Sequence, residues 1–515
     1  LTTSLSTLRA AHALRKELLN HQRDFFTSAI REAEQAPVKA YVVGTPSDPA
    51  RNYHFLRILR QHQIEVYELA RRMQADGKTF EPGSAYVVPT NQKQYRFLTA
   101  LFERRTQFDD SLFYDISTWT LPLAFNLPYT ELKSLSRDFL GKGVTAPAWP
   151  QGTIVAGSSP TNGAGTYAYV FEWSGYYAPR ALYRLQRAGV KAKVATKPFE
   201  AATAEGNKKF DYGTILIPLG IQQEKADTVR KILDLIARED GVRVYALTTG
   251  LSASGIDLGS PSYASLDMPR VALVVGPGVA FTDAGEIWHL LDQRFNMPVS
   301  LLENTALGRV DLTRYNTLAL ASGNYASIDS AGRENLRRWV GNGGTLIAME
   351  NAVEWAVENR LATAKFRTEE APKKDTLVAR RSYADEERHT RALGINGSIF
   401  EATLDRTHPL AFGYESDRLS IFRGTTVFMD PTRSPYASPV VYTANPLLSG
   451  YLHKQQEKHL KNSAAVSVSA LRNGRVILMT DNPNFRAFWY GTNKLFLNGI
   501  FFGQTIRQSS ARAEE

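Results

Sequence analysis

Four polar residues follow or lie near predicted strand ends and could take part in binding or catalysis: Asn324, Glu350, Asn351 and His408. Glu350 follows an apolar strand predicted at Thr345–Met349, and Asn324 follows another predicted at Thr317–Ala321. Doubly wound sheets bind their ligands at the carboxyl ends of such strands. We therefore expect these four residues to be ligand-binding residues. In a hydrolytic enzyme, Glu350, Asn324 and His408 would be the polar groups of the site.

Covalent catalysis has little support in the sequence. The chain contains no cysteine, which excludes thiolate nucleophiles, disulfides and thiolate zinc sites. The stretch closest to a serine nucleophile elbow is Gly250–Ser254, but it lacks the second glycine that the tight turn requires. We therefore expect no catalytic residue in this chain.

A zinc site is also not expected. His62 and Glu65 have the H-x-x-E spacing that some zinc peptidases use. Residues 64–66 alternate as in a strand, so that an odd spacing would point the two side chains to opposite faces. His54 would lie on a preceding helix. We expect a histidine at a helix end and an exposed glutamate, with no metal bound by these residues.

The elements that must position the candidate residues recur three times along the chain. Strands rich in Val, Ile and Tyr alternate with amphipathic helices, which is typical of a doubly wound sheet with parallel strands. The first repeat has strands at Lys39–Gly44, Ile64–Leu69, Ala85–Pro89 and Phe113–Ser117. The second has strands at Tyr167–Trp173, Val190–Thr196, Thr214–Pro218 and Val242–Leu247. The third has strands at Arg270–Gly276, Val299–Glu303, Thr317–Ala321 and Thr345–Met349.

Composition indicates where these repeats begin and end. We expect a helical lead-in over residues 1–36, a first α/β repeat over 37–150, a second over 151–265, and a third domain over 266–515. A charged insertion is expected near residues 356–391 of the third domain. Toward the end, a hairpin is expected at Val466–Asp481 with Asn473-Gly474 as its turn, followed by a helix at Lys494–Phe502.

Charge and hydropathy narrow the classes of partner. The 515-residue chain carries a formal charge of +10, but its 61 Lys and Arg are interleaved with 51 Asp and Glu. Nucleic-acid grooves need a clustered basic stripe, so we expect no nucleic acid as a partner. No apolar run reaches the length of a membrane helix, so we expect no membrane span.

The third repeat resembles a known fold. The stretch from Val271 to Trp355, with Gly343-Gly344, a strand and then Glu350-Asn351-Ala352, is similar to class I glutamine amidotransferase-like domains, in which a nucleophile occupies this elbow. Here the elbow offers neither Cys nor Ser, and His408-Pro409-Leu410 echoes the family's His-Pro-Glu without its acid. The resemblance implies an α/β fold of three flavodoxin-like or amidotransferase-like units with mainly parallel sheets, in which the amidotransfer site is lost.

A second resemblance covers essentially the whole chain. The stretches Tyr95–Tyr129, Thr403–Tyr414 and Asp481–Gly503 are similar to the C-terminal portion of large bacterial proteins of the zinc carboxypeptidase family. No stretch matches that family's zinc ligands or catalytic glutamate, which belong to an N-terminal domain. The resemblance therefore implies zinc only in that domain, no cofactor in this chain, and a periplasmic or secreted location.

The leading hypothesis is a non-catalytic accessory region of a zinc metallocarboxypeptidase-like protein, which positions substrate, binds a ligand or mediates assembly. Its expected partners are the parent protein's N-terminal peptidase domain and a peptide substrate, and a homo-oligomer is left open. A stand-alone hydrolase using polar strand-end residues of the third repeat is the second hypothesis. A glycan- or cell-wall-binding module is the third, suggested by 25 Phe, 23 Tyr and 7 Trp.

Overall fold

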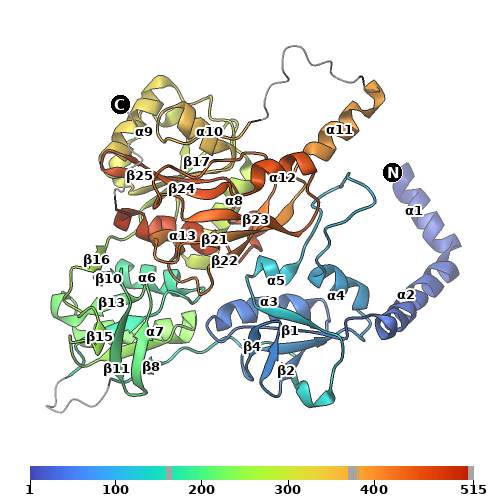
Figure 1. Cartoon of the computed structure of the whole chain (residues 1–515), viewed down its shortest axis with the longest axis horizontal. Helices are drawn as coiled ribbons and strands as arrows, with labels where there is room; N and C mark the ends of the chain where they lie inside the picture. Colours follow the sequence, from blue (N-terminus) through green and yellow to red (C-terminus); the bar gives the residue numbers. More distant parts are fainter. Residues whose placement is uncertain (158–164, 369–379, 381, 508–515) are drawn as a thin grey trace. The chain divides into compact units, whose positions relative to one another are not determined.

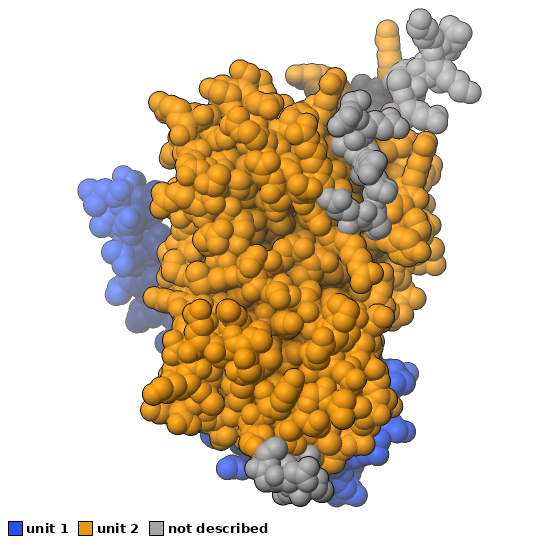
Figure 2. Space-filling model, turned by 90° about the vertical axis from the view of Figure 1, so that its left-hand side faces the viewer, with its two compact units in different colours: residues 1–103, 119–122, 127–149 blue, residues 104–118, 123–126, 150–515 orange. Residues whose placement is uncertain are grey.

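The computed structural model of the chain describes residues 1–157, 165–368, 380, 382–507 (Figure 1). It divides into two compact units. Unit 1 comprises residues 1–103, 119–122 and 127–149, and unit 2 comprises residues 104–118, 123–126 and 150–515 (Figure 2). The short helix α5 (Leu121–Ala124) is shared between them. Each unit is described separately below.

Unit 1 begins with two helices, α1 (Thr2–Ala13) and α2 (Arg15–Gln35), followed by a five-stranded sheet in the order β6-β1-β5-β2-β7. Its strands are β1 (Ala40–Val43), β2 (Tyr67–Leu69), β5 (Tyr86–Pro89), β6 (Tyr129–Leu132) and β7 (Leu140–Gly143). A separate hairpin is made by β3 (Met73–Ala75) and β4 (Lys78–Phe80). Helices α3 (Pro49–Gln61) and α4 (Tyr95–Phe102) follow β1 and β5.

The predicted parallel sheet is wrong for unit 1, because every strand pairing in it is antiparallel. Helix α3 makes the expected crossover from β1 to β2, but it leaves a gap between these strands. The hairpin β3–β4 then replaces a second crossover helix, so β5 returns in the opposite direction and fills the gap. The predicted strand at Phe113–Ser117 is also wrong. The Ser117 backbone N–H donates to the carbonyl oxygen of Asn396 at 2.8 Å and does not join a ladder.

The first sheet of unit 2 repeats the strand arrangement of the sheet of unit 1, with β8 as an additional strand. The two segments therefore repeat as predicted, but their strands are mostly antiparallel and not parallel. The order of this sheet is β16-β10-β13-β9-β14-β8, and only the β14–β8 pair is parallel. The strands are β8 (Ile154–Val155), β9 (Ala168–Phe171), β10 (Ala192–Ala195), β13 (Ile215–Pro218), β14 (Val244–Leu247) and β16 (Tyr263–Leu266). Again a crossover helix, α6 (Ala178–Arg187), is followed by a hairpin, β11 (Phe199–Thr203) and β12 (Gly206–Phe210), and then by helix α7 (Ala226–Asp240). The short strand β15 (Ser254–Gly255) pairs with β11.

The second sheet of unit 2 has nine strands, in the order β18-β17-β19-β20-β25-β24-β23-β21-β22. The first five are parallel: β17 (Val271–Val275), β18 (Ser300–Glu303), β19 (Thr317–Leu320), β20 (Thr345–Met349) and β25 (Gly474–Met479). The rest are antiparallel: β21 (Ser398–Leu404), β22 (Arg418–Arg423), β23 (Val440–Ser449) and β24 (Ala464–Leu471). The chain is thus a mixed α/β protein with one partly parallel sheet, and three parallel units are not present in the described residues.

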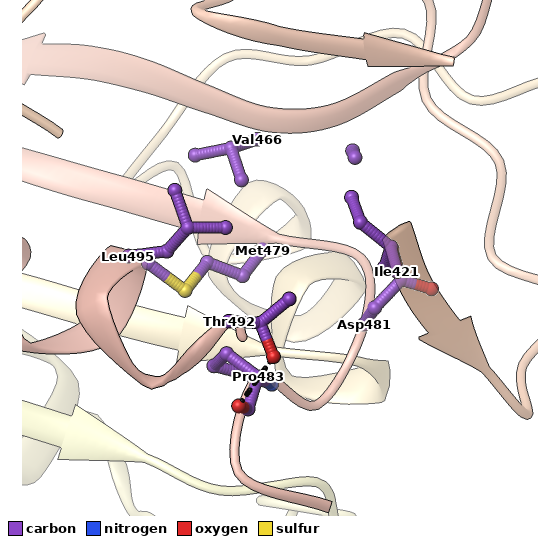
Figure 3. A pocket seen from close by; sticks show the side chains of 8 residues that line it. Ile421, Val466, Met479, Asp481, Pro483, Thr492 and Leu495 are labelled. Carbon is purple, nitrogen blue, oxygen red and sulfur yellow. Dashed lines mark hydrogen bonds between the residues drawn. The ribbon is translucent and has the colours of Figure 1, made fainter. Parts of the chain in front are cut away.

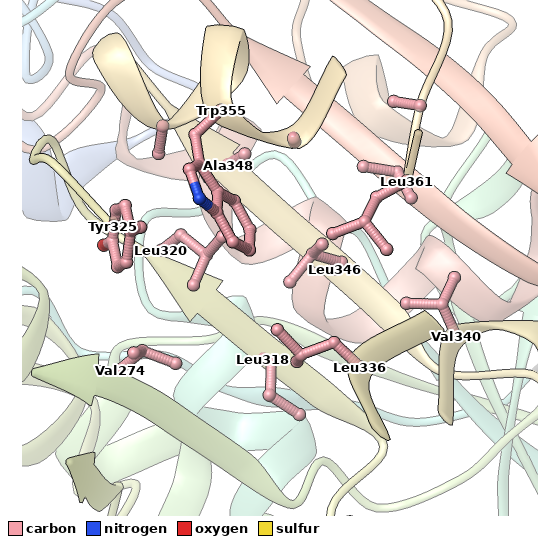
Figure 4. Close-up of a cluster of buried hydrophobic side chains, with 14 of the residues drawn as sticks. Val274, Leu318, Leu320, Tyr325, Leu336, Val340, Leu346, Ala348, Trp355 and Leu361 are labelled. Carbon is pink, nitrogen blue, oxygen red and sulfur yellow. The ribbon is translucent and has the colours of Figure 1, made fainter. Parts of the chain in front are cut away.

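Helices cover the parallel half of this sheet and enclose its core. They are α8 (Phe281–Trp288), α9 (Ser330–Gly341), α10 (Asn351–Glu358) and α13 (Asn493–Phe502). Two further helices of the unit are α11 (Glu386–Leu393) and α12 (Lys454–Leu460). Strand residues Leu318, Leu320 and Leu346 pack against Leu336 and Trp355 of the helices (Figure 4). This rigid core fixes the strand ends that carry the candidate residues.

Candidate functional site

Glu350 occupies a strained turn between strand β20 and helix α10. Its backbone torsions are φ 51° and ψ −121°, a region that residues with a side chain rarely adopt. The strand ladder holds it there, because the Glu350 N–H donates to the Met479 carbonyl oxygen at 2.9 Å, just beyond the β20–β25 pairing. Strain of this kind costs about 1–3 kcal/mol and is concentrated at functional sites. The elbow thus directs the Glu350 side chain to the carboxyl edge of the sheet.

The carboxyl group of Glu350 shares a hydrogen bond with the carboxyl group of Asp283. Burial, together with the negative charge of Asp283, raises the pKa of Glu350 to about 8, and burial also raises the pKa of Asp283. At neutral pH Glu350 is therefore protonated and donates to Asp283. The Ser322 hydroxyl, which follows β19, makes a second hydrogen bond to Glu350. Both carboxyl-bearing residues are only half-buried, so solvent reaches them.

A second carboxylate on α8, Glu286, organises the loop that follows β25. Its Oε2 accepts from the Asn482 Nδ2 at 2.6 Å, and its Oε1 accepts from the Arg486 backbone N–H at 2.7 Å. Burial raises the pKa of Glu286 to about 7. Arg486 in turn forms an ion pair with Asp115, with its Nη1 2.7 Å from the Asp115 Oδ2. The β25 loop is therefore fixed beside the carboxyl pair, and three carboxyl groups share the edge of one sheet.

Glycines allow the loops after β17 and β19 to meet at this edge. Gly278 has φ +85°, and a Cβ atom there would lie 2.2 Å from the Asn324 carbonyl oxygen. The neighbouring residues Val279 and Gly323 form an isolated antiparallel bridge. Because a side chain at position 278 would force the loops apart, glycine is required for this close approach.

Asp481, the next acidic residue at the strand ends, has a structural role. Its Oδ1 accepts from the Arg423 Nη1 at 2.7 Å and its Oδ2 from the Tyr442 hydroxyl at 2.7 Å, and all three residues are buried. A cavity of about 10 Å³ adjoins Asp481 and Thr492, whose hydroxyl donates to the Pro483 carbonyl oxygen (Figure 3). This space holds about one water molecule and no larger ligand.

The four candidate residues have different surroundings in the structure. Glu350 lies in the carboxyl pair, and the exposed Asn351 follows it as the first residue of α10. Asn324 is exposed, and its Oδ1 accepts from the Ala326 N–H at 2.9 Å within its own turn. His408 is buried, and its Nδ1 accepts from the Leu410 N–H at 3.2 Å in a turn that packs against α13. Burial lowers the pKa of His408 to about 4, so this side chain is a neutral turn cap.

Sequence reasoning missed Asp283, Glu286 and Ser322. Asp283 and Glu286 lie in the first two turns of α8, which begins at Phe281. One signal in the sequence could have found the two acidic residues. Asp283 and Glu286 are three residues apart, so they lie on the same face of a helix, and this helix follows a parallel strand, where ligands bind. Ser322 directly follows the predicted strand Thr317–Ala321, so the rule applied to Asn324 would also have selected it.

An apolar hollow of about 260 Å³ lies under α8 at the edge of the sheet. Leu273 and Val275 of β17, Leu301 of β18, and Ala284 and Trp288 of α8 contribute to its walls. Neither Asp283 nor Glu350 lines it. It is therefore a space distinct from the carboxyl pair.

Two further properties of the described chain bear on its class. Across the residues that the structure describes, no group of three or more His, Asp or Glu side chains is arranged to hold a metal ion. Among the described helices, none combines the length and apolar character that crossing a bilayer requires.

Comparison with known proteins finds only distant similarities to solved structures. No family model matches this chain, and no curated protein matches it. Among solved structures, a ThuA-like protein from Parabacteroides merdae is 15% identical over 47% of this chain and 93% of its own, with a TM-score of 0.31. A GMP synthase component from Thermoplasma acidophilum is 9% identical over 45% of this chain and 92% of its own, with a TM-score of 0.28. A β-galactosidase from Bacillus circulans is 14% identical over 46% of this chain and 30% of its own, with a TM-score of 0.24.

These similarities are to ThuA-like and class I glutamine amidotransferase-like domains, and they extend to no activity of this chain. The zinc carboxypeptidase resemblance finds no counterpart in them and remains a prediction from the sequence. The predicted peptidase and zinc associations remain predictions in the same way.

Proposed function

We propose that the chain is a non-catalytic, ligand-binding accessory region, and that the Asp283–Glu350 carboxyl pair binds a primary amine such as a lysine side chain. The observation that carries this proposal is a half-buried acid pair holding one proton at a strained strand-to-helix elbow. Groups with perturbed pKa values in strained positions are concentrated at functional sites.

The charge of the pair sets the class of ligand. With Glu350 protonated and Asp283 ionised, the pair carries one negative charge, and the carboxyl of Glu286 adds to it above its pKa of about 7. Arg486, in the loop beside the pair, is engaged by Asp115. An ammonium group would displace the shared proton and leave two carboxylates around one cation, which lowers the repulsion between them. The site therefore favours a cation over an anion.

An accessory role is consistent with this chemistry. Glu350 occupies the elbow where amidotransferase-like domains place a nucleophile, and a carboxylate there cannot replace a thiolate in that reaction. The sequence resemblance to the C-terminal portion of zinc carboxypeptidase proteins supplies the context, in which an amine site would position a peptide substrate for the parent protein's peptidase domain.

Binding of Nα-acetyl-lysine methylamide, measured by isothermal titration calorimetry, tests the proposal. The association constant is expected to rise at least roughly tenfold between pH 6 and pH 8, because binding requires Glu350 to lose its proton while the ligand amine stays charged. The Nζ-acetylated ligand should not bind. Glu350→Gln should abolish binding, whereas Glu358→Gln, an exposed change at the end of the same helix, should leave it unchanged. Binding that is equal for both ligands would overturn the amine assignment.

The second candidate is hydrolysis by the carboxyl pair itself, and the shared proton favours it specifically. Two carboxyl groups that share one proton can take a proton from water with the ionised member and donate one to a carbonyl oxygen with the protonated member. The Ser322 hydroxyl would orient Glu350 for this transfer.

Amide hydrolysis assayed with a library of blocked dipeptides tests this second candidate. If the pair is catalytic, Asp283→Asn and Glu350→Gln should each lower kcat/KM by about 10²–10⁴-fold, and the pH profile should be bell-shaped. Glu358→Gln should retain full activity. No turnover by the unaltered chain, or turnover that survives both substitutions, would eliminate this function and leave amine binding to be judged by calorimetry alone.

A further inference from the structure

The apolar hollow under α8 opens at one edge of the nine-stranded sheet. Strand β18 lies at that edge and, among the described strands, pairs only with β17. Its Leu301 lines the hollow and is 56% exposed, while Phe281 and Trp288 of α8, which also line it, are 86% and 40% exposed. Three large apolar side chains are therefore left partly uncovered around one concave space. Concave apolar spaces of this kind are typical of binding sites.

Small residues of α8 keep the hollow open. Ala284 and Gly285 line it between the two aromatic side chains, and a Cβ atom at Gly285 would meet no other atom within 4 Å. The packing of the described chain therefore does not require glycine here, although glycine is unfavourable within a helix. The volume of about 260 Å³ exceeds the roughly 150 Å³ of an engineered cavity that binds benzene. An aliphatic or aromatic side chain from another molecule can therefore enter it.

The register of the sheet shows which side chains of an added strand would point toward the hollow. Leu273 of β17 is level with Leu301 of β18, and both line the hollow. The next residue of β17, Val274, packs in the core on the other face (Figure 4). Side chains at the same level of neighbouring strands point to the same face. A strand added beside β18 would therefore direct the residue level with Leu301 toward the hollow, while its backbone pairs with the free edge of β18.

A carboxylate lies further along the same face of β18. Glu303 follows Leu301 by two residues, is level with Val275 of β17, and is exposed. Within the part of the chain that the structure describes, no cation is paired with it. A Cβ atom on Gly276, which lines the hollow, would lie 2.6 Å from the Glu303 Oε2, so this carboxylate adjoins the hollow. Because opposite charges at the same level of adjacent strands attract, an added strand would favour Lys or Arg two residues from its apolar side chain.

We propose that the edge of β18 binds an extended peptide as an added strand, with an aliphatic or aromatic side chain in the hollow and a basic residue beside Glu303. The free backbone edge selects a polypeptide, the uncharged walls of the hollow select an apolar side chain, and Glu303 selects a cation. Residues 298–304 of a second copy contain no Lys or Arg, so they lack that cation. The site is independent of the carboxyl pair, since neither Asp283 nor Glu350 lines the hollow.

Fluorescence anisotropy of a labelled peptide, acetyl-Thr-Lys-Thr-Leu-Thr-Lys-Thr-amide, tests the proposal on the full chain. This probe places Lys two residues from Leu in either strand direction, and saturable binding is expected. Replacing its Leu by Ser should weaken binding at least roughly tenfold, because the apolar side chain is lost from the hollow. Replacing both Lys by Glu should weaken it roughly two- to fivefold, because like charges would then lie side by side. Equal binding of the Leu and Ser probes would overturn the proposal.

Two substitutions in the chain test the site itself. Gly285→Leu fills the hollow and should weaken binding of the Leu probe at least roughly tenfold. The unfolding temperature of this variant should stay equal or rise, since no atom obstructs the new side chain and leucine favours a helix. Glu303→Lys should weaken binding of the Lys probe and strengthen binding of the Glu probe, each roughly two- to fivefold. Glu334→Lys, an exposed change on α9, should alter neither.

The charge exchange at position 303 separates this site from the carboxyl pair. Glu303→Lys leaves Asp283 and Glu350 in place, so a reversed preference between the two probes supports binding at β18. Unchanged binding by Gly285→Leu, or an unchanged preference in Glu303→Lys, would contradict it. Sedimentation velocity of the unaltered chain without peptide tests for a different occupant. A dimer that Gly285→Leu dissociates would show that a second copy covers the edge, and would overturn the peptide assignment.

Discussion

Replacing Glu350 by glutamine is expected to raise the free energy of unfolding of unit 2 by about 2–4 kcal/mol at pH 8 and to leave it unchanged near pH 4. The folded chain holds the Glu350 proton up to a pKa of about 8, whereas the unfolded chain releases it near the ordinary value of 4.5. Stability is therefore lost as pH rises from the unfolded to the folded pKa, at about 1.4 kcal/mol per unit. Glutamine keeps the shape and a donor for Asp283 but has no proton to lose.

Urea unfolding of both proteins at a series of pH values measures this difference. The expected gain is smaller than the full shift of the Glu350 pKa would give, because Asp283 shares the proton and also titrates high. Glu358→Gln is the control, since Glu358 is exposed at the end of the same helix. A stability difference between Glu350→Gln and the unaltered protein that is equal at pH 4 and pH 8 would show that folding does not raise the pKa of Glu350.

Replacing Arg423 by methionine is expected to destabilise unit 2 by about 3–5 kcal/mol. The Arg423 side chain is fully buried, and its guanidinium bonds to Asp481 at 2.7 Å and to the Thr480 hydroxyl at 3.1 Å. It also donates to the Val427 carbonyl oxygen and lies 4.7 Å from the centre of the Phe428 ring. Methionine fills much of the space but leaves the Asp481 carboxylate buried without its cation.

A matched control lies on the same strand. Arg418 pairs with Glu401 at 3.0 Å, but its side chain is 50% exposed, so Arg418→Met should cost less than about 1 kcal/mol. Adding Asp481→Asn to Arg423→Met should recover part of the loss, because the orphaned charge is then removed. Chemical denaturation of the three variants checks the ranking. An equal cost at positions 418 and 423 would show that burial does not govern these ion pairs.

Local sequence signals predicted elements well and sheet direction badly. The helix expected at Lys494–Phe502 is α13, and the hairpin expected at Val466–Asp481 is β24–β25. Its turn, however, lies at Arg472-Asn473, and Arg472 carries the positive φ of 52°. Gly474 is the first residue of β25. A Cβ atom at this position would lie 1.8 Å from the Val340 carbonyl oxygen, so the residue has to be glycine. Glycine was required for packing and was misread as a turn residue.

Strand direction depends on what joins the strands, and that was the weak point of the sequence reasoning. Short segments at Met73–Phe80 and Phe199–Phe210 form hairpins, which reverse the next strand. No strands were predicted in these segments, so the helix–strand alternation alone predicted parallel sheets. In the third repeat no hairpin intervenes before β20, and there the parallel prediction is correct.

The candidate site was predicted in part, for a physical reason. Glu350 could be placed because a strand end and an elbow are local features. Asp283 and Glu286 could not, since their relation to Glu350 depends on how α8 is seated beside β20 and β25. His408 caps its own turn, where its Nδ1 accepts from the Leu410 N–H.

The nine-stranded sheet has a consequence for synthesis on the ribosome. Strand β25, residues 474–479, pairs with β20 on one side and β24 on the other, so the centre of the sheet is completed only after all the other strands of this sheet have been made. Until then the edge of β20 carries unpaired backbone groups. The sheet of unit 1 needs only residues 40–143 and can form early. A nascent chain halted before residue 474 should therefore combine a folded first sheet with an incomplete nine-stranded sheet that is aggregation-prone and depends on chaperones.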